Sequence, residues 1–214
     1  MKRFLSIILI ITSFNINVIG GNKNVKGKNE ALIATNKWDF GVEWSYVGTY
    51  AYNTKYNFFN TEGYRVNAHS EVSGYWSNAE VLLHAGYNLN RRWNISLYTG
   101  VIGLADIHYA VPVSLRMTHY FAKNSILADT WLAFAEVGSG ICIKNEPQDI
   151  WSGKIGGGYR INLSEATKLD FIAAFRLTYT HPQIIDGNDK IPLEYTNLNS
   201  ALLQSFSIGM AITF

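Results

Sequence analysis

The chain has 214 residues, enough for one closed domain or a single barrel, and it combines 13 Tyr, 11 Phe and 6 Trp with only 4 Pro. This composition favours strands joined by tight turns over helices. The formal net charge of +2 falls to 0 without residues 1–20, which hold Lys2, Arg3 and no acid, so no basic excess indicates a nucleic-acid partner. The single cysteine, Cys142, excludes an intramolecular disulfide and a cysteine-based metal site.

Residues 1–20 have the pattern of a cleaved secretory signal peptide. Lys2 and Arg3 precede an apolar run that ends near Phe14, and small residues follow up to about Gly20. A membrane-anchoring helix is the alternative, but the apolar run is shorter than the roughly 20 residues that span a bilayer. The polar, Lys-rich residues 21–36 predict a flexible N-terminal extension.

From residue 37 onward, segments of alternating character follow one another to the C-terminus. In the first, KWDFGVEWSYVGTYAY (37–52), large apolar residues take the even positions, and Asp39 and Glu43 take odd ones. A period of two predicts a strand with two unlike faces. Seven further segments behave in the same way: 78–89, 93–109, 111–121, 130–143, 151–163, 168–181 and 199–214. Each is about ten residues or longer, as a tilted strand needs to cross a bilayer.

The links between these segments differ in length. The second, fourth and sixth links are short, the third is centred on Tyr109 and Ala110, and the first (53–74) and seventh (182–198) are long. Short turns at one end and longer loops at the other are typical of a transmembrane barrel.

A soluble sandwich or lipocalin-like barrel would also alternate, with its apolar face inward. Here the other face is dominated by Gly, Ser, Thr, Ala and Asn, and charged residues are only 16% of the chain. Small polar residues suit the crowded interior of a small barrel better than a soluble surface. Aromatic residues also gather at both strand ends, with Trp38 and Trp131 near short turns and Trp151, Tyr50 and Tyr52 near long links, as in membrane-interface girdles. The prediction is an all-β fold, a closed antiparallel eight-stranded transmembrane β-barrel over residues 37–214.

The C-terminal stretch SIGMAITF resembles the terminal strand signal of outer-membrane barrels through Ser207, Gly209, Ile212 and Phe214. With the leader and the eight amphipathic segments, nearly all of the mature chain resembles the small OmpA/OmpX-type eight-stranded outer-membrane barrels. The resemblance implies a place in the outer membrane of a Gram-negative bacterium, contact with outer-membrane lipid, and delivery by the barrel assembly machinery through the C-terminal strand. It also implies that the N-terminus and the short turns lie in the periplasm.

Charged residues on the inward face of such a narrow barrel must pair, because unpaired buried charges carry a large desolvation penalty. Arg116 and Glu136 are symmetric about the short link near residue 126, and Arg160 and Asp170 about residue 165, so each couple should meet across neighbouring strands. Glu80 and Lys154 share this face and are assigned no partner. The expected lumen salt-bridge network comprises Arg116, Glu136, Arg160, Asp170, Glu43 and Arg176.

No catalytic, cofactor-binding or metal site is predicted. Lipid-modifying outer-membrane enzymes need Ser, His and an acid that converge. His69, Ser70 and Glu71 are adjacent in an extended segment and point in opposite directions, and five scattered His have no ligand spacing. We therefore expect a non-enzymatic envelope barrel with a structural or surface-interaction role and a filled lumen. The alternatives are a lipid A acyltransferase or deacylase, or an adhesin that binds a surface ligand through the unusually apolar loops 53–74 and 182–198. The favoured interpretation of these loops is that they fold over the barrel rim or extend the strands beyond the membrane.

Overall fold

The computed structural model describes residues 37–60, 62–104, 108–121, 129–143, 148–164, 166–187 and 189–214. The predicted signal peptide and N-terminal extension lie outside these residues. No helix in the described ranges is long and apolar enough to cross a membrane.

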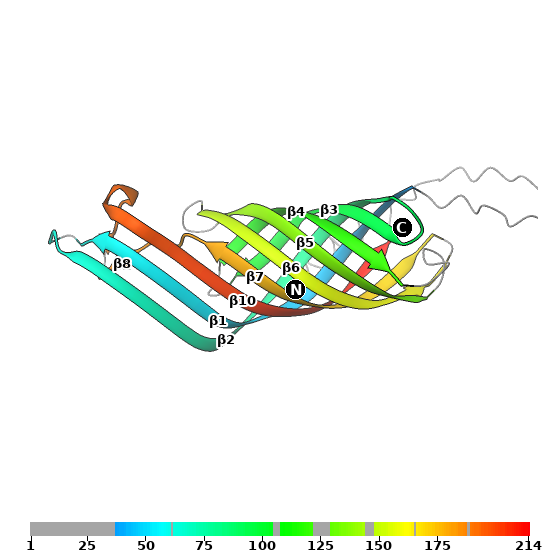
Figure 1. Cartoon of the computed structure of the whole chain (residues 1–214), viewed down its shortest axis with the longest axis horizontal. Helices are drawn as coiled ribbons and strands as arrows, with labels where there is room; N and C mark the ends of the chain where they lie inside the picture. Colours follow the sequence, from blue (N-terminus) through cyan, green and yellow to red (C-terminus); the bar gives the residue numbers. More distant parts are fainter. Residues whose placement is uncertain are drawn as a thin grey trace, which may run out of the picture. The chain divides into compact units, whose positions relative to one another are not determined.

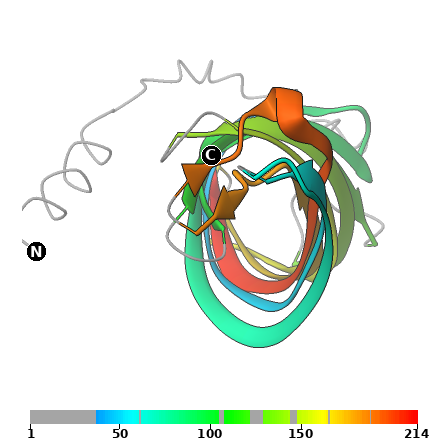
Figure 2. The same ribbon diagram turned by 90° about the vertical axis from the view of Figure 1, so that its left-hand side faces the viewer.

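Eight long strands pair into a closed antiparallel barrel (Figures 1 and 2). The order around the ring is β1, β2, β3, β4, β5, β6, β7 and β10, and β10 pairs with β1 to close it. This topology confirms the predicted fold class. The strands are β1 (Trp38–Phe59), β2 (Arg65–Asn88), β3 (Trp93–Leu104), β4 (His108–Tyr120), β5 (Thr130–Cys142), β6 (Gln148–Asn162), β7 (Lys168–Thr180) and β10 (Thr196–Thr213).

In the barrel strands, most polar and charged side chains point into the lumen and most large apolar side chains point outward. In β7 the burial alternates along the whole strand, with Asp170 and Arg176 buried in the lumen and Phe171 and Leu177 exposed outside. Large apolar side chains cover the outer surface, whereas most charged groups of the barrel strands are buried. A soluble barrel has the reverse arrangement, so the outer surface is one that faces lipid.

Aromatic side chains face outward at both ends of the barrel. At the turn end, where the chain terminates at Phe214, Trp38 and Trp131 project outward and are 60% and 66% exposed. At the opposite end, named here the loop end, Trp151 and Tyr179 project outward as well. Aromatic side chains at both ends of an apolar band match interfacial girdles.

Three strands continue past the loop end as a ribbon, named here the extension (Figure 1). β1, β2 and β10 have 22, 24 and 18 residues, whereas the other barrel strands have 12 to 15. β1 and β2 pair as far as Phe59 and Arg65, but β3 joins β2 only from Glu80. Most of the expected loop 53–74 is therefore strand, and the connection itself is the tight turn after Phe59, where Gly63 has a φ of 82°.

The segment between β7 and β10 folds against the extension. It contains the strands β8 (Ile185–Asp186) and β9 (Asp189–Lys190), which form a two-stranded sheet, and the 3-10 helix η1 (Leu193–Tyr195). Ile184 and Ile191 pack with Phe58 of β1 in a small apolar cluster. Asn199 of β10 also donates a hydrogen bond of 2.6 Å from Nδ2 to the carbonyl oxygen of Pro182.

Two sequence-based details are wrong. β3 ends at Leu104 and β4 begins at His108, so Tyr109 and Ala110, on which the third link was expected to be centred, belong to β4. β1 also shifts register between Thr49 and Ala51, which reverses the alternation of its faces. Tyr50 stacks outside on Phe206 with ring centroids 5.3 Å apart, but Tyr52 turns inward and packs on the buried apolar cluster.

Candidate functional site

The centre of the lumen is occupied by Arg116 of β4, which binds two carboxylates. Its Nε donates to Glu136 Oε2 at 2.7 Å, across the β4–β5 ladder where the two residues are register partners. Its Nη1 and Nη2 donate to Glu43 of β1 at 2.6 and 3.1 Å. Two parallel bonds from one guanidinium to one carboxylate are the strongest geometry for such a pair. All three residues are buried.

Lys154 and Glu80 extend this group toward the loop end. Lys154 Nζ lies 3.1 Å from Glu43 Oε1 and 2.5 Å from Glu80 Oε1. Arg176 Nη1 in turn lies 3.0 Å from Glu80 Oε2. The result, named here the central network, alternates three acids with three bases, so its formal charges cancel. Its members in order are Glu136, Arg116, Glu43, Lys154, Glu80 and Arg176.

A separate ion pair lies nearer the turn end. Arg160 Nε and Nη2 donate to the two carboxylate oxygens of Asp170 at 2.7 and 2.6 Å. These residues are register partners on β6 and β7. The Arg160 guanidinium also lies 4.4 Å from the centroid of the Tyr120 ring, which covers its face.

Aromatic rings shield the central arginine. The Arg116 guanidinium carbon lies 4.0 Å from the centroid of the Tyr98 ring and 4.3 Å from that of Phe134. The Tyr98 hydroxyl accepts a further hydrogen bond of 3.1 Å from Arg116 Nη1, and His84 stacks on the Tyr98 ring with centroids 4.8 Å apart. The Arg116 guanidinium is therefore paired with carboxylates and also packed between the faces of aromatic rings.

A small cavity of about 20 Å³ remains in the turn-end half of the lumen, lined by Asp39, His84, Asn94 and Arg160 among others. Space of this size holds about one water molecule. Asp39 Oδ1 and His84 Nδ1 are buried beside it, and neither makes a hydrogen bond within the described part of the chain. The cavity has no room for an organic substrate.

The structure brings together both couples inferred from symmetry, Arg116 with Glu136 and Arg160 with Asp170. Glu43 also joins Arg116, but Arg176 contacts Glu80 instead of another member of the expected set. Sequence reasoning placed Glu80 and Lys154 on the lumen face without partners. Their partners lie on non-adjacent strands, which strand symmetry does not reveal.

The four residues of the expected assembly signal lie on the last strand, which closes the barrel. Ser207 and Gly209 oppose Val47 and Ser45 of β1, with Ser207 buried in the lumen. Phe214 exchanges two backbone hydrogen bonds with Phe40, of 2.8 and 3.3 Å. Ile212 opposes Val42 in the same ladder.

The structure does not assemble a triad from His69, Ser70 and Glu71. His69 Nε2 lies 3.6 Å from Glu71 Oε1 on the exposed part of β2. Ser70 lies between them in the strand, so its side chain is on the opposite face. Among the described residues, no group of three or more His, Cys, Asp or Glu is arranged to hold a metal ion.

No protein-family model and no curated protein sequence matches the chain. Among solved structures, it is similar to the outer membrane protein OprG from Pseudomonas aeruginosa, with 10% identity over 82% of this chain and 95% of that chain and a TM-score of 0.49. Neisserial surface protein A matches with 12% identity, 81% and 95% coverage and a TM-score of 0.44. The N-terminal β-barrel domain of Pseudomonas aeruginosa OprF matches with 16% identity, 81% and 97% coverage and a TM-score of 0.38.

Because these sequence identities are low, the assignment of the fold rests on the chain's own geometry. Eight strands close into a ring, the lipid-facing surface is apolar, and the lumen is filled by paired charges. Closed barrels satisfy every backbone polar group within the sheet, which the interior of a bilayer requires. The chain thus has the fold of a small eight-stranded transmembrane β-barrel, the kind that lies in the outer membrane of Gram-negative bacteria.

Proposed function

We propose that the protein is a non-enzymatic outer-membrane barrel with a closed lumen, whose extension is a surface for interaction with other proteins. The central network fills the barrel interior with side chains that have their partners inside the lumen. A lumen filled by side chains in this way leaves no path for solutes. Function is then expected at the loop end and not in the interior.

The observation that carries the proposal is the outer edge of β2. From Arg65 to Ala79 this strand pairs with β1 on one side, and among the described residues no strand pairs with its other side. The other edge of the extension, on β10, is flanked by the segment that holds Pro182 and η1. The β2 edge is thus the accessible one of the two.

An uncovered edge offers a row of backbone donors and acceptors to an incoming strand. Natural edge strands are often protected by charged side chains, especially Lys, or by Pro; this stretch, RVNAHSEVSGYWSNA, contains no Lys or Pro, and its acidic and basic residues are Arg65, His69 and Glu71. Extended segments of other proteins bind such edges by adding a strand, with main-chain hydrogen bonds for affinity. The partner that fits is therefore an extended polypeptide segment outside the cell.

The test is binding of purified protein in lipid nanodiscs to an array of unstructured peptides. Replacing Asn67 and Val72, which are both exposed on the β2 edge strand, by lysine should abolish binding, because edge lysines oppose strand addition. Leu198→Lys on β10 is the matched control and should bind like the unchanged protein. Equal binding by all three proteins, or none by the unchanged protein, would reject the interaction surface.

Two further assignments belong to this proposal. The barrel assembly machinery recognises a signal on the last strand that consists of Ser207, Gly209, Ile212 and Phe214. Loss of these residues should therefore reduce insertion in cells more than refolding into lipid vesicles.

The enzyme alternative is tested by mass spectra of lipid A from cells with and without the protein. Identical spectra are expected, and a changed acyl number would overturn the non-enzymatic assignment.

A further inference from the structure

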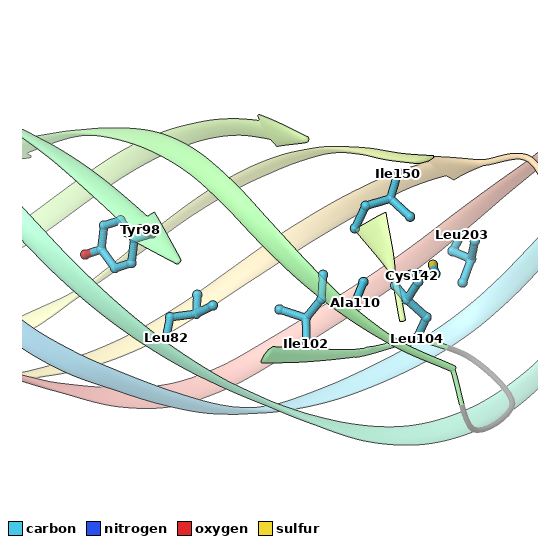
Figure 3. Packing of buried hydrophobic residues seen from close by; sticks show 8 residues of the cluster. All are labelled: Leu82, Tyr98, Ile102, Leu104, Ala110, Cys142, Ile150 and Leu203. Carbon is cyan, nitrogen blue, oxygen red and sulfur yellow. The ribbon is translucent and has the colours of Figure 1, made fainter. Parts of the chain in front are cut away.

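Apolar side chains collect inside the loop end of the barrel, beyond the central network. The largest buried apolar cluster contains eight residues, which Figure 3 shows as sticks. Five of them gather at one end of the cluster, with Tyr98 at the other. We name these five the loop-end ring: Leu104, Ala110, Cys142, Ile150 and Leu203.

The positions of these residues along the strands place the ring at the mouth of the lumen. Leu104 and Cys142 are the last residues of β3 and β5, and Ala110 and Ile150 are the third residues of β4 and β6. Leu203 faces Tyr52 across the β10–β1 ladder. None of the five is more than 3% exposed.

Neighbouring strands complete the ring. Tyr52 of β1 and Trp76 of β2 pack against the cluster, with their ring centroids 6.3 Å apart in an edge-on arrangement. On β7, Thr178 is the register partner of Leu203 and is 0% exposed. All eight barrel strands thus contribute a side chain at this level, and two of these side chains, Tyr52 and Thr178, carry a hydroxyl group.

The charged residues lie deeper. Arg116 and Glu136 are six residues from Ala110 and Cys142 along β4 and β5, toward the turn end. The small polar cavity is deeper still, because Asp39 is the second residue of β1 and Arg160 is the third residue from the end of β6. From the loop end inward, the lumen is therefore first apolar, then charged, and then polar with space for water.

We infer that the loop-end ring, and not the central network, is the barrier that keeps water and ions out of the lumen from the loop end. The inference rests on the closed lumen of the proposed function and names the residues that close it. Charged groups attract water and ions, whereas a narrow apolar constriction excludes both by dewetting. Exclusion of water from this side also preserves the strength of the ion pairs below it.

Cys142 supplies a reporter within the ring, since it is the chain's only cysteine. Purified protein in lipid nanodiscs is treated with a water-soluble maleimide, and ion conductance is recorded in planar bilayers. Ile150→Ser with Leu203→Ser makes the ring polar and smaller. We expect its Cys142 to react at least roughly tenfold faster, which corresponds to about 1.4 kcal/mol in the free energy of opening, and ion conductance to rise.

Two controls separate the ring from the network and from general unfolding. Lys154→Met with Glu80→Gln removes one charge of each sign from the central network, and this variant should stay closed with slow labelling. Thr178→Val keeps the shape of the ring and should also stay closed. Heat-dependent gel mobility shows that each variant is folded, and Ile150→Ala is the milder ring variant where the double change does not fold.

Three outcomes are distinct. A closed unchanged protein with open ring variants and a closed network variant supports the inference. A closed unchanged protein whose network variant conducts while the ring variants stay closed overturns the inference and leaves the proposed function standing. Conductance by the unchanged protein rejects the closed lumen itself, and both proposals then fail.

Discussion

Arg116 Nη1 lies 2.6 Å from Glu43 Oε2, although β4 and β1 are three strands apart around the barrel. The pair therefore crosses the lumen and joins opposite walls. Because Arg116 also binds Glu136, its loss leaves two carboxylates short of a partner in a buried site. Arg116→Met should destabilise the barrel by about 3–5 kcal/mol, the usual effect of breaking a buried ion pair from one side.

Reversible urea unfolding in lipid vesicles measures this loss, with heat-dependent gel mobility as a second readout. Arg116→Glu should destabilise the barrel more than Arg116→Met does, and it should fail to give the heat-resistant form on gels. Arg65→Met is the control, since Arg65 is exposed on the extension and bonds only to Asn57 among the contacts described, and it should change stability by no more than about 0.5 kcal/mol. Normal folding of Arg116→Glu would show that the network is not needed for the barrel.

The difference between Glu136 and Glu43 shows what sequence could predict. Arg116 and Glu136 are related by a hairpin, so counting outward from the turn finds the pair. Glu43 lies 73 residues from Arg116, and the contact depends on how far the sheet is sheared when it closes, which strand alternation does not encode. The partners of Lys154 could not be predicted for the same reason, since they also lie on strands that are not its neighbours.

Alternation of residue types located the strands but not the point where β1 changes faces. Tyr50 and Tyr52 have the same parity, and only the register shift next to Thr49 sends one outward and the other inward. A bulge adds a residue without changing the composition, so the pattern of large and small side chains looks continuous across it. The sequence left open whether residues 53–74 fold over the barrel rim or extend the strands beyond the membrane, because a strand in water can alternate like one in lipid.

The ion pair between Arg160 and Asp170 is isolated enough for a charge-swap test. Arg160→Asp and Asp170→Arg each place like charges opposite one another on β6 and β7 and should each lower stability. The double variant restores opposite charges and should recover part of the loss. A double-mutant cycle in lipid vesicles should give a coupling free energy of about 0.5–3 kcal/mol. Simple additivity of the two losses would mean that the pair contributes nothing specific.

Gly209 occupies a place on β10 where a side chain has no room. A Cβ atom there would collide with the Trp44 carbonyl oxygen and lie 2.7 Å from the Ser45 Cα atom. Gly209→Ala should therefore lower stability by about 1–3 kcal/mol through overpacking. Gly153→Ala is the matched control, because nothing lies within 4 Å of its added Cβ atom, and it should leave stability unchanged within about 0.5 kcal/mol.

The two variants, Gly209→Ala and Gly153→Ala, are compared by refolding of the purified proteins into lipid vesicles and by insertion in cells. A deficit of Gly209→Ala in lipid vesicles, where no assembly machinery is present, measures packing against β1, and a larger loss of insertion in cells measures recognition by the machinery. Normal refolding together with poor insertion in cells would leave recognition alone and contradict the packing cost. Equal behaviour of Gly209→Ala and Gly153→Ala in both settings would contradict the close approach of β10 to β1.

Thr178 and Thr180 offer a final comparison, since both are buried on the lumen face of β7 but only one has a partner for its hydroxyl. Thr180 Oγ1 donates to the Asp149 carbonyl oxygen at 3.2 Å, whereas Thr178 Oγ1 makes no hydrogen bond to any described residue. Replacing an unpaired buried hydroxyl by a methyl group of the same shape removes a desolvation penalty. Thr178→Val should therefore raise the free energy of unfolding by about 1 kcal/mol, and Thr180→Val should lower it by a similar amount. Urea midpoints in lipid vesicles decide between this order and its reverse, and a destabilised Thr178→Val would mean that the hydroxyl at the loop-end ring meets water, against an apolar seal at that level.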